Sequence, residues 1–426
     1  MNEELLHYVW RYKKFPLGNL QTTDGEPIEI IDFGLPNTNA GADFSNAKIK
    51  INNLIWAGDV EIHLKSSDWQ QHQHHKNRAY NNVILHVVAE CNCRVFDADN
   101  REIPQLELKI PNRIIDNLFS HDVHFIPCEK SLAELKSSVV KDAWLESLLV
   151  ERFIRKTEDI KAVLAQNGND WENAFYLFLA RNFGFGKNAD AFMMLAKSLP
   201  LNYLRKHKDN LLQTEALLFG QAGLLPDKSS DDYTNLLIQE YNFLRQKFQL
   251  TPIPTHLWKM FRLRPMNFPH IRIAQFAALL QKYDCLFSKI IENPIKEALH
   301  ELFRVEVSDF WNTHYNFSNP SRSRSKHLTN NSLDAIIINS VIPFLFAYGQ
   351  LQGRDSLCEQ ALNLLNELPA EKNKIVEKFH QLQFPTHSAA DTQALLQLKN
   401  CYCDTRKCLQ CRFFHEITNS TFNEKP

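Results

Sequence analysis

The run from 60 to 65 alternates apolar and ionisable side chains, as expected for a β-strand with one ionisable side. That side would carry Glu61, His63 and Lys65 in order, and a further carboxylate, Asp43, lies about one strand upstream. Mg²⁺ usually takes one or two protein carboxylates and keeps several waters. The spacing therefore predicts a magnesium site at which Asp43 and Glu61 are the ligands.

The same residues could cleave a phosphodiester. Such a reaction needs a positioned water and a group that stabilises charge, and His63 or Lys65 could serve because both share the side of Glu61. The predicted catalytic set is Asp43, Glu61, His63 and Lys65. An ordinary solvent-facing strand also alternates charged and apolar residues, so that interpretation stays open.

Histidines are dense in this part of the chain, at 63, 72, 74, 75 and 86. Imidazole suits Zn²⁺, Fe²⁺ or Ni²⁺ better than Mg²⁺. Their spacing fits no zinc motif: in a helix His72 and His75 would share a face and His74 would point elsewhere. Surface histidines, phosphate contacts or hydrogen-bonded core histidines are the alternatives.

Cysteines crowd near the end of the chain. Of nine in all, four lie within eleven residues, with His415 just beyond. Soft ligands this close together can enclose Zn²⁺ or hold an iron–sulfur cluster in a reducing compartment. The predicted metal ligands are Cys401, Cys403, Cys408 and Cys411. The alternative is that Cys408 and Cys411 are small apolar residues packed on a core.

The elements that must position these side chains form an α/β domain over residues 1–128. Asn2 predicts the cap of a first helix with Glu3 and Glu4 in its first turn. Later elements are predicted from periodicity and turn residues: strands over 27–33, 47–51, 54–65, 83–96 and 103–110, and a helix from Ser67 to about 80. The strand over 83–88 is apolar on both faces, which predicts an interior position in the sheet.

Helical periodicity dominates residues 129–398, and the low glycine count of 12 agrees with a helical domain. Residues 399–426 form the cysteine segment and a flexible tail. We therefore expect an α+β protein: a mixed-sheet domain of order αβββαβ followed by a large all-α domain.

The amino-acid composition excludes few classes of function. Lys and Arg total 48 against 49 for Asp and Glu, so affinity for nucleic acid would need a local basic patch. The longest apolar stretch, 335–349, is shorter than the ~18 residues that span a bilayer and contains Asn339 and Pro343. We expect a cytoplasmic protein with no membrane association. The run Gly184–Lys187 lacks the outer residues of a phosphate-binding loop, so nucleotide binding is not expected there.

The strand order and the Asp43…Glu61-x-His63 pattern resemble the PD-(D/E)XK nuclease core, although Ala42 stands where that core usually has Pro and His63 where it has Lys. Four runs and the cysteine group also resemble an uncharacterised family found mainly in Bacteroidota, domain of unknown function 2851: 41–44, 56–69, 80–88 and 264–269. The first resemblance implies a Mg²⁺-dependent hydrolase of nucleic-acid phosphodiesters, and some such nucleases carry an iron–sulfur cluster near the C-terminus. The alternative is a non-catalytic binding or scaffold protein that keeps the fold.

Overall fold

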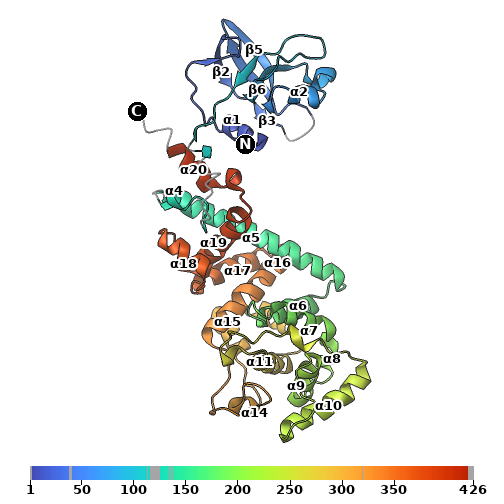
Figure 1. The fold of residues 1–426 in the computed structure, drawn as a ribbon. Helices are drawn as coiled ribbons and strands as arrows, with labels where there is room; N and C mark the ends of the chain where they lie inside the picture. The colour runs from blue at the N-terminus through green and yellow to red at the C-terminus, as the bar shows by residue number, and fades with distance from the viewer. Residues whose placement is uncertain are drawn as a thin grey trace. The chain divides into compact units, whose positions relative to one another are not determined.

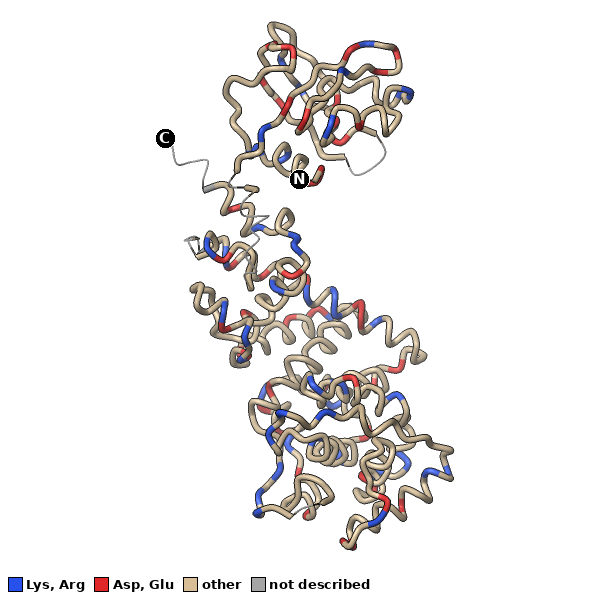
Figure 2. Tube along the Cα trace, viewed as in Figure 1, with Lys and Arg blue, Asp and Glu red and all other residues tan. Residues whose placement is uncertain are grey.

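The chain divides into two compact units in a computed structural model (Figure 1). The structure describes residues 2–37, 41–112, 114–115, 125–133, 135, 138–318 and 320–420. One unit combines Met1–Trp144 with Leu398–Pro426, and the other is Leu145–Gln397. Basic and acidic residues alternate along the traces of both units (Figure 2).

A mixed sheet is the centre of the first unit, with strand order β1-β2-β4-β5-β6-β7 and β3 paired to β4. The strands before β5 pair antiparallel, whereas β5, β6 and β7 run parallel. Their bounds are β1 Leu20–Gln21, β2 Pro27–Asp32, β3 Leu35–Pro36, β4 Phe44–Ile51, β5 Leu54–Lys65, β6 Val83–Glu90 and β7 Gln105–Glu107. As expected, β6 is an interior strand, and its residues 83–88 are buried.

The first helix, α1 (Glu3–Arg11), follows its sequence signals. The side-chain oxygen of Asn2 accepts a hydrogen bond from the Leu5 N–H at 3.2 Å, and the acidic first turn suits the helix dipole. Its apolar stripe is buried, and α1 packs against β5. The predicted cap and stripe are therefore confirmed.

The predicted helix from Ser67 to about 80 is wrong. It is replaced by a short helix, α2 (Asp68–Gln71), and two 3-10 turns, His74–Lys76 and Arg78–Tyr80. Gln73 has a left-handed backbone, with φ of 61°, which ends helical geometry. Two predicted strands are also shorter: 83–96 ends at Glu90, and 103–110 is reduced to β7.

Gly58 allows β5 and β6 to approach each other closely. A Cβ built at this position would lie 2.4 Å from the backbone oxygen of Asn82 and 2.5 Å from a side-chain carbon of Ile84. Any larger residue would push β5 from β6 just before the segment that carries Glu61 and His63.

Four further helical segments belong to the described part of the first unit. They are α4 (Glu129–Ala133), the π-helical turn Lys399–Cys403, the 3-10 turn Cys408–Gln410 and α20 (Arg412–Ser420). Helix α5 (Ser138–Gln166) begins in this unit and continues into the second.

Helices build the second unit around one apolar core. The apolar stretch Asn330–Leu351 is long enough to cross a membrane, but 78% of its most apolar window is buried, as in a core helix of a soluble protein. The helices are α6 Trp171–Phe183, α7 Ala189–Ser198, α8 Leu201–Arg205, α9 Leu211–Gln221, α10 Asp232–Phe248, α11 Pro269–Lys282, α12 Leu286–Glu292, α13 Lys296–Phe303, α14 Asp309–Thr313, α15 Asn330–Ile336, α16 Ile342–Leu351, α17 Asp355–Glu367, α18 Lys374–Gln381 and α19 Ala389–Leu398.

Candidate metal centre

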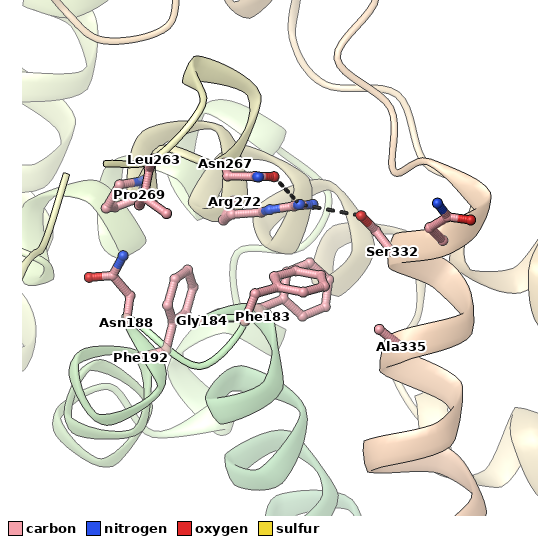
Figure 3. A pocket seen from close by; sticks show the side chains of 12 residues that line it. Phe183, Gly184, Asn188, Phe192, Leu263, Asn267, Pro269, Arg272, Ser332 and Ala335 are labelled. Atoms are coloured by element: carbon pink, nitrogen blue, oxygen red, sulfur yellow. Dashed lines mark hydrogen bonds between the residues drawn. The ribbon is translucent and has the colours of Figure 1, made fainter. Parts of the chain in front are cut away.

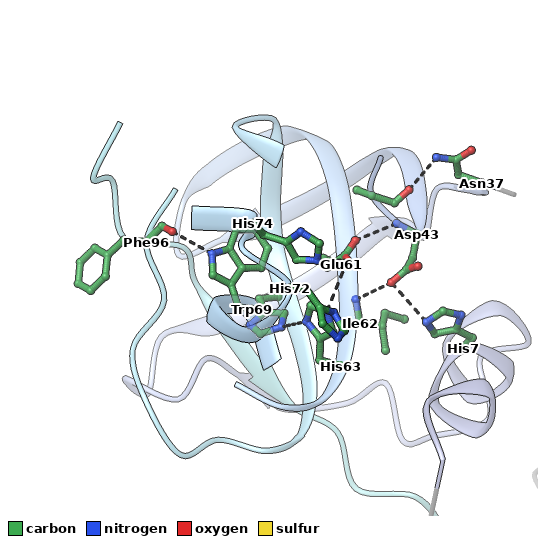
Figure 4. Close-up of polar contacts among 12 residues, drawn as sticks. His7, Asn37, Asp43, Glu61, Ile62, His63, Trp69, His72, His74 and Phe96 are labelled. Carbon is green, nitrogen blue, oxygen red and sulfur yellow. Dashed lines mark hydrogen bonds and ion pairs between the residues drawn. The ribbon is translucent and has the colours of Figure 1, made fainter. Parts of the chain in front are cut away.

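The carboxylates of Asp43 and Glu61 each accept a backbone N–H from the neighbouring strand, where the start of β4 lies beside β5 (Figure 4). The Asp43 N–H donates to Glu61 Oε2 at 3.0 Å, and the Ile62 N–H donates to Asp43 Oδ2 at 2.9 Å. This reciprocal pair fixes both carboxylates on neighbouring antiparallel strands. The sequence prediction that these two residues come together is therefore met by the geometry.

The other oxygen of Glu61 faces imidazoles (Figure 4). Glu61 Oε1 lies 3.2 Å from His74 Nε2 and 3.6 Å from His63 Nε2, and His63 Nε2 lies 3.1 Å from His72 Nδ1. The three imidazoles offer ligand atoms that all lie within 4.8 Å of one another. The three imidazoles thus form a cluster of nitrogen donors, and Glu61 Oε1 lies beside two of them, His63 and His74.

Three elements bring the histidines together. His63 projects from β5, while His72 ends α2 and His74 begins the following 3-10 turn. The left-handed residue Gln73 between them changes the chain direction, so His72 and His74 both reach His63. The sequence expectation of a continuous helix, which separated His74 from His72, missed this arrangement.

His74 Nε2 is buried and makes no aligned hydrogen bond with any residue in the described part of the chain. A buried imidazole nitrogen without such a bond is only partly compensated for its lost hydration. It faces the Glu61 carboxylate, and its ring stacks on Tyr80 at 3.8 Å between centroids. This nitrogen is therefore available as a metal ligand.

A series of contacts that passes through His86 on β6 and Gln105 on β7 orients His63. The Gln105 side-chain amide nitrogen donates to the Cys93 carbonyl at 2.8 Å. The Gln105 side-chain oxygen therefore faces His86, and this contact is looser than an aligned hydrogen bond. With its proton on Nδ1, His86 accepts at Nε2 from His63 Nδ1, 2.8 Å away. The lone pair of His63 Nε2 then faces Glu61 and His72.

Burial sets the charge state of this cluster. Burial and the neighbouring histidines lower the pKa of His63 to about 3, and burial lowers the pKa of His86 to about 4. Burial, aided by the charge of Asp43, raises the pKa of Glu61, and His74 opposes the rise only in part. His63 is neutral at physiological pH, the form in which imidazole binds metals.

Helix α1 contributes to the rim of the site. His7 Nε2 lies 3.3 Å from Asp43 Oδ2, and Glu3 interacts electrostatically with both residues. Burial lowers the pKa of His7, but Asp43 and Glu3 together raise it above its usual value. A cavity of about 450 Å³ lies beside His7 and Asp43, and Leu409 and Gln410 of the C-terminal segment also line it.

Two residues considered from the sequence lie outside the cluster. Lys65 is exposed at the end of β5, where its Nζ lies 3.4 Å from a Glu90 carboxylate oxygen. His75 is half-buried and is not among the three clustered imidazoles. The shared strand face of Glu61, His63 and Lys65 therefore leads from the buried centre to solvent.

The structure also gathers thiols from distant parts of the chain. Cys128, Cys403, Cys408 and Cys411 interact electrostatically with one another, so Cys128 joins three of the four predicted ligands. Cys128 precedes α4, which contacts α20, and Cys411 immediately precedes α20. Burial raises the pKa of Cys128 to about 12 and that of Cys411 to about 11. Cys401, the remaining predicted ligand, is half-buried and lies two residues before Cys403.

The family model described as "Protein of unknown function (DUF2851)" matches residues 3–374. The chain belongs to this family. The match includes the whole sheet, the histidine cluster and most of the helical unit, and it ends before the C-terminal cysteines. Comparison with curated proteins gave no match, and comparison with solved structures gave none either.

Proposed function

We propose that the first unit is a metal-dependent phosphodiester hydrolase. Its ion would be held by Glu61, His63, His72 and His74, with Asp43 next to them. The observation that carries this proposal is a cluster of three imidazoles, two of which also lie within 3.6 Å of the buried Glu61 carboxylate.

The distances between these donors suit a metal ion. Nitrogen and oxygen ligands lie about 2.0–2.2 Å from zinc, so neighbouring donors around a tetrahedral ion are roughly 3.3–3.5 Å apart. Three of the separations among these donors are 3.1, 3.2 and 3.6 Å, and the three imidazole ligand atoms all lie within 4.8 Å of one another. The donors could therefore close on one ion with small side-chain movements.

The donor set favours a transition metal over the expected magnesium. Imidazole is a good ligand for Zn²⁺, Mn²⁺ and Fe²⁺, whereas Mg²⁺ prefers oxygen ligands and water. A magnesium site at Asp43 and Glu61 remains the alternative, because the two carboxylates are neighbours.

The substrate class rests on the arrangement of the strands around the site. Asp43 immediately precedes β4, Glu61 and His63 follow on the antiparallel β5, and α2 leads to the parallel β6. This order is similar to the PD-(D/E)XK nuclease core, in which an Asp and a Glu hold the catalytic ion. The cavity beside His7 gives a substrate access to Asp43.

The residues divide the chemical work. A divalent ion in such a site stabilises charge on a phosphoryl oxygen and lowers the pKa of a water molecule. His7, which is 35% exposed and paired with Asp43, can exchange a proton with a substrate or solvent in the cavity. Tyr80 and Trp69 pack on His74 and keep its ring in place.

A cleavage assay with labelled single-stranded and duplex DNA and RNA tests the function. The full chain would be freed of metal and assayed with Mn²⁺, Zn²⁺, Fe²⁺ or Mg²⁺. Glu61→Gln should abolish cleavage, because an amide is a far weaker ligand than a carboxylate, whereas Lys65→Gln should retain it. No cleavage by the parent with any ion would favour the alternative, a binding or scaffold protein.

We also propose that Cys128, Cys403, Cys408 and Cys411 hold Zn²⁺ or an iron–sulfur cluster. The thiols come from two distant segments and influence one another's pKa, so they lie in the same region of the first unit. The buried indole nitrogen of Trp144 lies beside Cys411 without an aligned hydrogen bond and could donate to a metal-bound sulfur. Such a metal would fix the segment 408–411, which includes two residues of the cavity wall.

A further inference from the structure

Two segments that are far apart in the sequence, around Gly184 and around Asn267, border one cavity in the second unit. The cavity has a volume of about 200 Å³ and lies among α6, α7, α11 and α15 (Figure 3). Gly184 and Phe185, from the glycine-containing run after α6, line one part of it. Asn267 and Pro269, from the proline-rich run before α11, line another.

Arg272 brings a positive charge into this cavity. The residue is only 6% exposed and lies in the first turns of α11. Its guanidinium donates to Asn267 Oδ1 at 2.7 Å, to Gln275 Oε1 at 2.9 Å and to Ser332 Oγ at 3.3 Å. It also lies 4.0 Å from the ring centroid of Phe185.

None of these partners balances the charge of Arg272. All three acceptors are neutral, and the described residues that line the cavity include no Asp or Glu. The Nε of Arg272 is buried and has no hydrogen-bond partner in the described part of the chain. A buried cation usually has a paired anion, because removing it from water costs several kcal/mol.

The charge persists at neutral pH. Burial lowers the pKa of the Arg272 guanidinium to about 10, which still leaves it protonated. The N-terminal end of α11 adds positive potential near the same place.

We propose that this cavity binds a small organic anion whose phosphate or carboxylate group pairs with Arg272. The apolar body of the ligand would contact the aromatic residues Phe183 and Phe192, which line the cavity. Guanidinium matches the geometry of both oxyanions through paired N–H donors. The site does not depend on the proposed hydrolase activity, because all its residues belong to the second unit.

Calorimetric titration of the full chain at low ionic strength tests this proposal. The probes are inorganic phosphate, phenyl phosphate, benzoate and the uncharged benzyl alcohol. Phenyl phosphate or benzoate should bind, more tightly than inorganic phosphate, and benzyl alcohol should not. Comparing the affinities for phenyl phosphate and benzoate would then identify the anionic group that the site prefers. Lack of binding by both aromatic anions would overturn the proposal.

Variants locate the binding site. Arg272→Lys should weaken the preferred anion at least about tenfold, because Lys lacks the planar pair of donors. Ala335→Phe keeps Arg272 but places a ring in the cavity that Ala335 lines, so it should also remove binding. Arg304→Lys is the matched control, since Arg304 is exposed. Unchanged affinity in Ala335→Phe would overturn the proposal even if Arg272→Lys does not fold.

Discussion

His63 Nδ1 lies 2.8 Å from His86 Nε2, across the parallel strands β5 and β6. His86 is fully buried, and its other side faces Gln105. Gln105 donates to the Cys93 carbonyl, so its side-chain oxygen faces His86 and favours a proton on His86 Nδ1. His86 Nε2 is then an acceptor, and the proton between the two histidines belongs to His63. His86 is therefore a positioning residue for the proposed metal site.

His86→Leu should weaken binding of Zn²⁺ or Mn²⁺ by about 10- to 100-fold, the usual effect of losing a residue that hydrogen-bonds to a metal-binding histidine. The variant leaves His63 Nδ1 without an acceptor and frees its ring to change tautomer. His86→Gln should restore part of the affinity, since its amide oxygen can accept from His63. Competition titration against a metal-sensitive dye measures this, with His75→Leu as control. Equal affinity in His86→Leu and the parent would contradict the assigned role.

The thiol cluster leads to a second prediction. Cys128→Ser should release as much metal as Cys408→Ser, because both remove one of four ligands, whereas Cys401→Ser and Cys285→Ser should keep it. Elemental analysis of anaerobically purified protein measures the metal. Visible absorbance would identify iron–sulfur, and colourless protein with about one zinc would identify a structural Zn²⁺ site. Retained metal in Cys128→Ser would exclude Cys128 as a ligand.

Local signals predicted the elements that carry the site. The Asn2 cap and the apolar stripe located α1, and the period of two along β5 placed Glu61 and His63 on one side. These features depend only on neighbouring residues, which explains why the sequence is sufficient. The hydrogen bond from the Ile62 N–H to Asp43 was not predicted, since the sequence placed Asp43 only about one strand upstream of Glu61.

The rest of the site depends on backbone geometry and long-range contacts. The left-handed Gln73 turns His74 toward His63, and no strong turn residue marks it: Asn or Gly would have been a clearer signal. Cys128 joins cysteines more than 270 residues later, which spacing alone does not show. Arg272 lies on a helix whose pattern resembles any core helix, and only the structure shows that its partners are neutral.

The second unit contains a buried acid whose titration should change stability. Glu215 on α9 is 1% exposed and accepts hydrogen bonds from Tyr233 at 2.7 Å and Ser308 at 2.9 Å. Burial raises its pKa from 4.5 to about 7, and these hydrogen bonds only partly oppose the rise. Because the folded chain holds this proton more tightly than the unfolded chain, the stabilisation is complete below about pH 4.5 and is lost as pH rises through 7.

Glu215→Gln should remove this dependence, because the amide does not ionise. Between pH 4 and pH 8 the parent should lose about 3 kcal/mol of unfolding free energy relative to the variant, the size expected for a shift of this order. Urea unfolding at a series of pH values measures the difference. Glu306→Gln is the control, since Glu306 is exposed and should leave the parent's pH dependence unchanged. A parent and a Glu215→Gln variant with parallel pH profiles would show that Glu215 ionises normally in the folded chain.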